Sequence, residues 1–138
     1  MILLTPELRA ALSANFAANM EAQHREQPHD PVPVVKFFNP MGSATWLAVE
    51  IHDDGDTLFG LADLGFGCPE MGCFSLLEIE AIRLPFGLHI ERDIGFASPF
   101  PLSAWAKAAR LAGSIIQAEI FLNRTLPGNS ELPPSHGG

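Results

Sequence analysis

The residues of this chain that are best suited to chemistry lie together in residues 58–73, which read LFGLADLGFGCPEMGC. Two carboxylates, Asp63 and Glu70, stand seven residues apart in this stretch. Glycine lets a backbone turn sharply and approach a ligand closely, and paired carboxylates serve acid–base catalysis or metal binding. The glycines that would shape the turn are Gly65, Gly67 and Gly72. The stretch predicts a loop over residues 63–72 with both carboxylates near its surface.

A structural interpretation of Asp63 and Glu70 stays open beside the catalytic one. Carboxylates in glycine turns accept hydrogen bonds from nearby backbone N–H groups and hold the turn, and we favour this commoner arrangement. Two phosphate-binding motifs are excluded. The glycines lack the third position that opens a helix in a dinucleotide fingerprint, and no Gly-Lys-Ser/Thr of a phosphate loop occurs.

The two cysteines of the chain, Cys68 and Cys73, also lie in this stretch. A structural zinc site needs four ligands, and only scattered histidines such as His52 and His89 are present to complete one. We therefore expect no metal site and no cofactor. The cysteines are expected to be reduced and partly buried, as free cysteines in a cytoplasmic protein commonly are.

A second run of charged residues, Glu91, Arg92 and Asp93, lies in a stretch of alternating apolar residues. Strand alternation points Arg92 away from its two acidic neighbours. The run would add an anion clamp and an acid to the loop site if the two lay side by side, whereas a surface ladder of salt bridges is the commoner arrangement.

Among enzyme classes, the sequence leaves only those based on carboxylates or a metal. No serine lies inside a Gly-x-Ser-x-Gly elbow, and no Cys/His nucleophile motif is recognisable. The enzymatic alternative is therefore a small carboxylate-based or metal-assisted hydrolase that uses Asp63, Glu70 and Asp93.

Three helices are expected from apolar spacing and from the capping residues Thr5 and Ser75. They cover residues 6–23, residues 75–83 and a closing segment from about residue 102, which Gly113 kinks or ends. The apolar stripes assigned to the core are Leu8, Leu12, Phe16 and Met20 in the first helix, and Trp105, Ala109, Ala112, Ile116 and Ile120 in the closing one.

Alternation of apolar residues predicts four strands, at residues 34–38, 44–51, 57–64 and 88–96. Asn39-Pro40-Met41-Gly42 suits a type I turn between the first two. In the second strand the alternation places Trp46, a core residue, and Glu50 on one face, and Ile51 on the other. We therefore expect an α+β fold: an antiparallel sheet of about four strands with an N-terminal helix, a short middle helix and a C-terminal helix.

Length and composition favour one domain. The 138 residues are 47% hydrophobic and 17% charged, which is enough apolar content for a core. We assign residues 1–124 to a single α+β domain and residues 125–138, rich in proline and glycine, to a flexible tail. The N-terminus has no basic segment or long apolar run, so we expect a cytoplasmic monomer or small homo-oligomer without membrane contact.

The net charge of −8 falls entirely within residues 50–93, which contain ten acids against Arg83 and Arg92. The acids are Glu50, Asp53, Asp54, Asp56, Asp63, Glu70, Glu78, Glu80, Glu91 and Asp93. Direct binding of nucleic acid through a basic patch is disfavoured, since that affinity depends on clustered Lys and Arg. An acidic middle face suits a basic protein partner or serves solubility.

Several blocks of the chain resemble a small bacterial family, a domain of unknown function that is common on plasmids and other mobile elements. In order, these blocks are LTPEL, PVVKFF, ATWL, LFGLADLG, PEMG, IERD and PLSA, and they extend to about Gly113. The resemblance supports the fold class and brings no established activity with it.

The leading functional expectation is a non-enzymatic interaction or regulatory protein of a mobile element that uses the acidic middle face and the 63–72 loop. A mimic of DNA would need a denser array of acids than ten residues scattered over strands and turns. A purely structural accessory subunit is a third interpretation, and it predicts a large exposed apolar patch.

Overall fold

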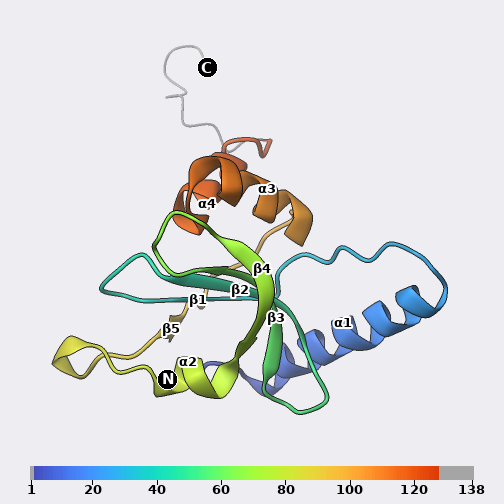
Figure 1. The fold of residues 1–138 in the computed structure, drawn as a ribbon, viewed down its shortest axis with the longest axis horizontal. Coiled ribbons are helices and arrows are strands. Elements are labelled where there is room, and N and C mark those ends of the chain that lie inside the picture. Colours follow the sequence, from blue (N-terminus) through green and yellow to red (C-terminus); the bar gives the residue numbers. More distant parts are fainter. Residues whose placement is uncertain (1, 128–138) are drawn as a thin grey trace.

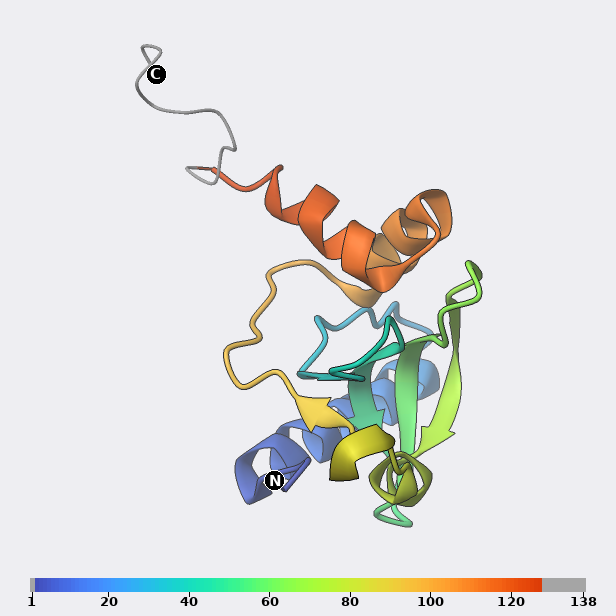
Figure 2. The ribbon, with the colours of Figure 1, turned by 90° about the vertical axis from the view of Figure 1, so that its left-hand side faces the viewer.

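Five antiparallel strands form a central sheet with helices on both of its faces (Figures 1 and 2). The structure is a computed structural model and describes residues 2–127. In chain order its elements are α1 (Pro6–His24), β1 (Val35–Phe38), β2 (Thr45–Ile51), β3 (Thr57–Asp63), β4 (Glu70–Ser75), α2 (Leu76–Ala81), the 3₁₀ turn η1 (Pro85–Gly87), β5 (Glu91–Arg92), α3 (Leu102–Ala112) and α4 (Ile115–Asn123).

The strand order in the sheet is β4-β3-β2-β1-β5, so consecutive hairpins build four strands and β5 returns to the free side of β1. The turn between β1 and β2 has the hydrogen bond expected of Asn39-Pro40-Met41-Gly42, from the N–H of Gly42 to the carbonyl oxygen of Asn39. The α+β class, the N-terminal helix and the short middle helix are confirmed. The sheet has five strands, close to the four expected.

The additional strand, β4, begins inside the loop predicted at residues 63–72, which we call the central loop. Its segment reads EMGCFS and has no clean apolar alternation, because an edge strand is exposed along much of both faces. The strand expected at residues 88–96 is shorter in the structure and covers only Glu91–Arg92. Asp93 ends it, since its carboxylate accepts the N–H of Gly95 and turns the chain.

One face of the sheet packs against α1 and α2. Phe37, Trp46 and Leu58 are buried there with Leu12 of α1, which confirms Trp46 as a core residue. Met20, assigned to the same helical stripe, is instead exposed, while Ala22 is the buried residue in the second half of α1 (Figure 1 shows the helix).

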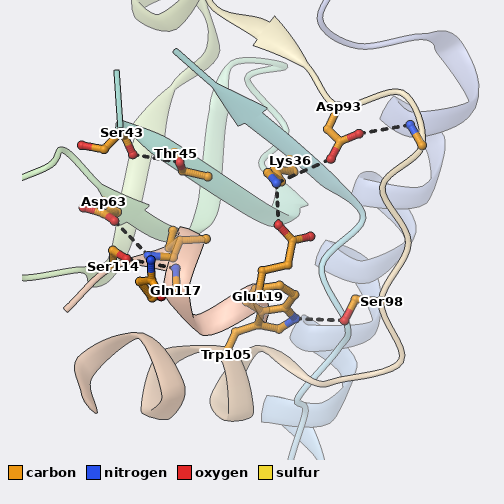
Figure 3. Close-up of polar contacts among 12 residues, drawn as sticks. Lys36, Ser43, Thr45, Asp63, Asp93, Ser98, Trp105, Ser114, Gln117 and Glu119 are labelled. Atoms are coloured by element: carbon orange, nitrogen blue, oxygen red, sulfur yellow. Dashed lines mark hydrogen bonds and ion pairs between the residues drawn. The ribbon is translucent and has the colours of Figure 1, made fainter. Parts of the chain in front are cut away.

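The other face packs against α3 and α4. Leu47 and Leu61 of the sheet meet Trp105 of α3 in a second buried cluster. The indole N–H of Trp105 donates to Ser98 Oγ at 3.0 Å, so its one polar atom is satisfied (Figure 3).

Gly113 divides the closing segment into two helices. It ends α3 with a left-handed φ of 84°, and Ser114 then caps α4 by accepting the N–H of Gln117. The break resets the phase of the apolar stripe: Ile115, Ala118 and Leu122 are buried in α4. The core assignment of Ala112, Ile116 and Ile120 is therefore wrong, since all three are exposed.

Within residues 2–127 no helix is long and apolar enough to cross a membrane. The tail assigned to residues 125–138 lies largely outside the described residues, which end at residue 127.

Candidate functional site

Asp63 joins the central loop to the C-terminal helices. Its side chain is fully buried at the end of β3, where it lies opposite Thr45 of β2. Oδ1 accepts the N–H of Gly65 at 2.9 Å. Oδ2 accepts the N–H of Ile115, the first residue of α4, at 2.9 Å (Figure 3). The carboxylate therefore holds the turn and also fixes the positive end of a helix onto the sheet.

The glycines of the loop have different roles. Gly65 adopts a left-handed φ of 92°, and a Cβ placed on it would lie 2.7 Å from Ser43 Oγ, so both conformation and space call for glycine. Gly67 is also left-handed, at 83°. Gly72 lies outside the loop, in β4.

Glu70 is exposed at the start of β4 and lies opposite Ala62 of β3. Residues that pair across two strands share a face of the sheet, whereas neighbours along a strand point to opposite faces. Since Ala62 precedes Asp63, the register places Glu70 and Asp63 on opposite faces. The structure does not bring these two carboxylates together.

Arg92 points to the α1 face of the sheet, because it pairs with Phe37. Its guanidinium donates to the carbonyl oxygens of Ile2 and Leu3, at 2.6 and 3.1 Å. These bonds hold the N-terminal segment against β5.

Asp93 takes part in a three-residue charge cluster at the edge of the sheet (Figure 3). Lys36 Nζ lies 3.5 Å from Asp93 Oδ2 and 2.6 Å from Glu119 Oε1. A cavity of about 540 Å³ beside the cluster is lined by residues of β1, β5 and α4. Sequence reasoning missed Lys36 and Glu119, which are 83 residues apart and carry no local signal.

Of the four predicted site residues, Arg92 and Asp93 line one cavity, whereas Asp63 and Glu70 are not brought together. The two cysteines do not add a metal site. Cys68 and Cys73 are free and exposed, so the expectation of partial burial is wrong. Among residues 2–127 no group of three His, Cys, Asp or Glu side chains is placed to hold a metal ion.

The acidic residues of the middle segment do not gather on one surface. Glu50 and Asp63 are buried, and the others are spread over turns, α2 and both edge strands. The densest group lies where the β2–β3 turn meets α2, since Asp56 accepts the N–H of Leu77 at 2.7 Å. We call the β2–β3 turn and α2 together the acidic end. The acidic end and the central loop lie at opposite ends of β3, about 20 Å apart at roughly 3.3 Å per residue.

The α3–α4 hairpin presents an apolar groove that sequence reasoning did not predict. Leu111 is 80% exposed and Phe121 57% exposed, and both line a groove of about 520 Å³ between the two helices. We call this feature the hairpin groove; its lining residues are Ala108, Leu111, Ala112, Gln117, Ile120, Phe121 and Arg124. The pair Gly113-Ser114, a helix end followed by a helix start, was the available signal for it.

Charge on the hairpin has the opposite sign from the rest of the chain. Of its four charged residues, Glu119 pairs with Lys36, while Lys107, Arg110 and Arg124 are exposed and basic. Arg124 lines the hairpin groove itself.

The central loop lies beside the hairpin (Figures 1 and 2). A Cβ placed on Gly113 would lie 4.0 Å from the carbonyl oxygen of Gly67, and Asp63 bonds the first N–H of α4. Phe66, at the tip of this loop, is 82% exposed. The loop thus adds a second exposed aromatic side chain to the neighbourhood of the hairpin.

The carboxyl group of Glu50 is perturbed by its surroundings. Burial raises the pKa of Glu50 above its ordinary value, and His29, the amide of Asn19 and His52 oppose this rise. His29 Nε2 lies 3.7 Å from Glu50 Oε2.

This perturbation predicts a pH-dependent stability. Because the folded protein binds the Glu50 proton more tightly than the unfolded chain does, the free energy of unfolding falls as pH rises from the ordinary value of 4.5 through the folded pKa. Glu50→Gln carries no such proton. We expect the variant to match the wild type below pH 4.5 and to exceed it at neutral pH, in urea unfolding measured across pH.

Asp53→Asn, in the exposed β2–β3 turn, is the matched control and should follow the wild-type profile more closely. A Glu50→Gln variant that keeps the full wild-type decline between acid and neutral pH would contradict this role of Glu50.

The fold and these sites define an α+β domain with an antiparallel five-stranded sheet between helical layers. Residues 3–116 match the family described as "Protein of unknown function (DUF2958)". The chain therefore belongs to the DUF2958 family. No curated protein and no solved structure matches the chain.

Proposed function

We propose that this protein is a non-enzymatic interaction or regulatory protein that binds a partner protein through the hairpin groove and the adjacent central loop. The sequence resemblance implies a mobile-element setting for it. The observation that carries the proposal is the exposure of Leu111 and Phe121 on either side of the groove. Contiguous apolar grooves on otherwise polar surfaces commonly bind an amphipathic helix or peptide.

The positive charge of the hairpin favours an acidic partner. Lys107, Arg110 and Arg124 are exposed there, whereas the net charge of the whole chain is −8. An amphipathic segment with acidic side chains would place its apolar face on Leu111 and Phe121 and its carboxylates near the basic residues. This partner chemistry is the reverse of the one expected from the acidic middle segment.

The acidic end of the molecule is not part of the proposed surface, because it lies at the far end of β3 from the central loop. The carboxylate-based hydrolase is not proposed. Asp63 is buried with both oxygens bonded to backbone N–H groups, and Glu70 lies on the other face of the sheet.

Site-specific photocrosslinking in cells tests the proposal. A photoreactive residue at position 111 should crosslink to a discrete protein, through a segment that mass spectrometry shows to be amphipathic and acidic. The matched control is position 77, a leucine that is 66% exposed on α2, and it should give no such product. Equal crosslinking at both positions, crosslinks only between copies of this chain, or none at position 111 would each overturn the proposal.

A further inference from the structure

A cavity of about 410 Å³, separate from the hairpin groove, lies where the second half of α1 meets the sheet and the start of α3. The segment after α1 runs back to the sheet along this side of the molecule (Figure 1). The polar residues that line the cavity are Asn19, Gln23, His29, Asp30, Glu50 and Ser103. Its apolar walls include Phe59, Met71 and Leu102.

Two polar groups in the cavity are poorly satisfied. Glu50 is only 4% exposed, yet the one hydrogen bond that its carboxylate accepts within the described part of the chain is a long one, 3.4 Å from Asn19 Nδ2. His29 Nε2 is buried and has no hydrogen-bond partner among residues 2–127, since Glu50 Oε2 is 3.7 Å away. Buried polar atoms are seldom left without a hydrogen-bond partner, so this pair is available to a ligand that supplies donors.

The two groups meet because of an irregularity in β2. The register between β2 and β3 shifts between Ala48 and Glu50, so Glu50 lies opposite Phe59 and turns toward the α3 side of the sheet. Asn15 of α1 donates to the carbonyl oxygen of Val49 at 2.9 Å, which satisfies the backbone at the irregularity.

The segment that carries His29 is fixed in place rather than loosely attached. Asp30 Oδ1 accepts the N–H of Ser103 at 3.0 Å, and its other oxygen accepts the hydroxyl of the same serine. The N–H of Leu102 donates to the carbonyl oxygen of Pro31 at 2.9 Å. The start of α3 therefore holds His29 opposite Glu50, as a preformed binding site requires.

We propose that this cavity binds a small organic primary amine. An ammonium group brings several hydrogen-bond donors, and the cavity offers two acceptors. One is the carboxylate of Glu50, and the other is Nε2 of His29 when the imidazole is neutral with its proton on Nδ1. No Lys or Arg lines the cavity, and Asp30 adds a second negative charge. Phe59, Met71 and Leu102 would contact the apolar body of the ligand. A metal ion fits less well, since no three His, Cys, Asp or Glu side chains among residues 2–127 are placed to hold one.

Titration of the full chain with 2-phenylethylamine, followed by ¹H–¹⁵N correlation spectra at mildly alkaline pH, tests the proposal. We expect saturable shifts centred on residues 19, 29, 50 and 71, and none with 2-phenylethanol, which has the same body without the charge. Glu50→Gln should weaken binding at least about tenfold, because it removes a charge-assisted hydrogen bond.

His29→Ala provides a second, independent variant, and it should also weaken binding. Asp53→Asn removes a carboxylate from an exposed turn and should leave the affinity unchanged. The proposal is overturned if the amine gives no saturable shifts, if the alcohol binds equally well, or if the cavity variants bind like the wild type. None of these outcomes bears on the hairpin groove, so the two proposals stand or fall separately.

Discussion

Replacing Asp63 with alanine is expected to lower the free energy of unfolding by about 3–5 kcal/mol, the largest effect of any single side chain discussed above. The substitution leaves the N–H groups of Gly65 and Ile115 without their acceptor at a buried position. Each lost bond to a charged acceptor costs about 1.5–3 kcal/mol. Urea unfolding of the full chain measures the change, and Asp63→Asn, which retains one acceptor oxygen, should fall between alanine and wild type.

Asp93→Ala is the matched control for this prediction. Asp93 also accepts the N–H of the glycine two residues later, Gly95, but it is partly exposed and makes no bond to a helix N-terminus. We expect its loss to cost about 1 kcal/mol or less. Equal losses at Asp63 and Asp93 would contradict the role of Asp63 as the link between the loop and α4.

Leu111→Glu and Phe121→Glu are each expected to weaken binding of the partner at least about 30-fold. A few side chains near the centre of an interface contribute 2 kcal/mol or more each, and here glutamate would also repel an acidic partner. The affinity of the purified partner captured at position 111 can be measured by calorimetry. Both side chains are exposed in the free protein, so its stability should change by no more than about 0.5 kcal/mol.

Leu77→Glu introduces the same charge at another exposed leucine, on α2, and should leave the affinity unchanged. Phe66→Ala and Phe86→Ala form a second matched pair for the affinity of the partner. Both phenylalanines are exposed on glycine-containing turns, but only Phe66 lies beside the hairpin, so only Phe66→Ala should weaken binding. Loss of binding in Leu77→Glu, or none in Leu111→Glu, would place the partner elsewhere.

Local signals were sufficient to predict most of the elements. Thr5 and Ser75 cap α1 and α2 through side-chain bonds to backbone N–H groups three residues later, as their sequence contexts indicate. The turn at Asn39–Gly42 and the burial of Trp46 follow from turn chemistry and from apolar alternation. These features depend on a few neighbouring residues, which a single sequence contains.

The strand irregularity explains one error that pattern reasoning could not avoid. Alternation places Trp46 and Glu50 on one face of β2, yet the register shift after Ala48 sends Glu50 to the face of Leu47 and returns Ile51 to that of Trp46. A shift of one residue reverses the facing of every later side chain in a strand. The pair formed by Glu50 and His29 was hidden for this reason.

The candidate site was predicted less well than the fold, because it depends on which distant elements meet. The turn glycines and Asp63 were identified as a loop, but its partner, the start of α4, lies 52 residues further along. Glu70 was placed in that loop since β4 has too little alternation to be read as a strand. The hairpin groove could not be predicted in this way, because the break at Gly113 changes which residues of the closing segment are buried.

Hydrogen–deuterium exchange of the full chain, with and without the partner captured at position 111, tests the central claim most directly. If the hairpin groove is the binding surface, exchange should slow in residues 111–124 and in the loop at residues 64–69, and it should be unchanged in residues 52–57 and 76–81. Slowed exchange confined to residues 52–57 and 76–81, the acidic end, would contradict the account.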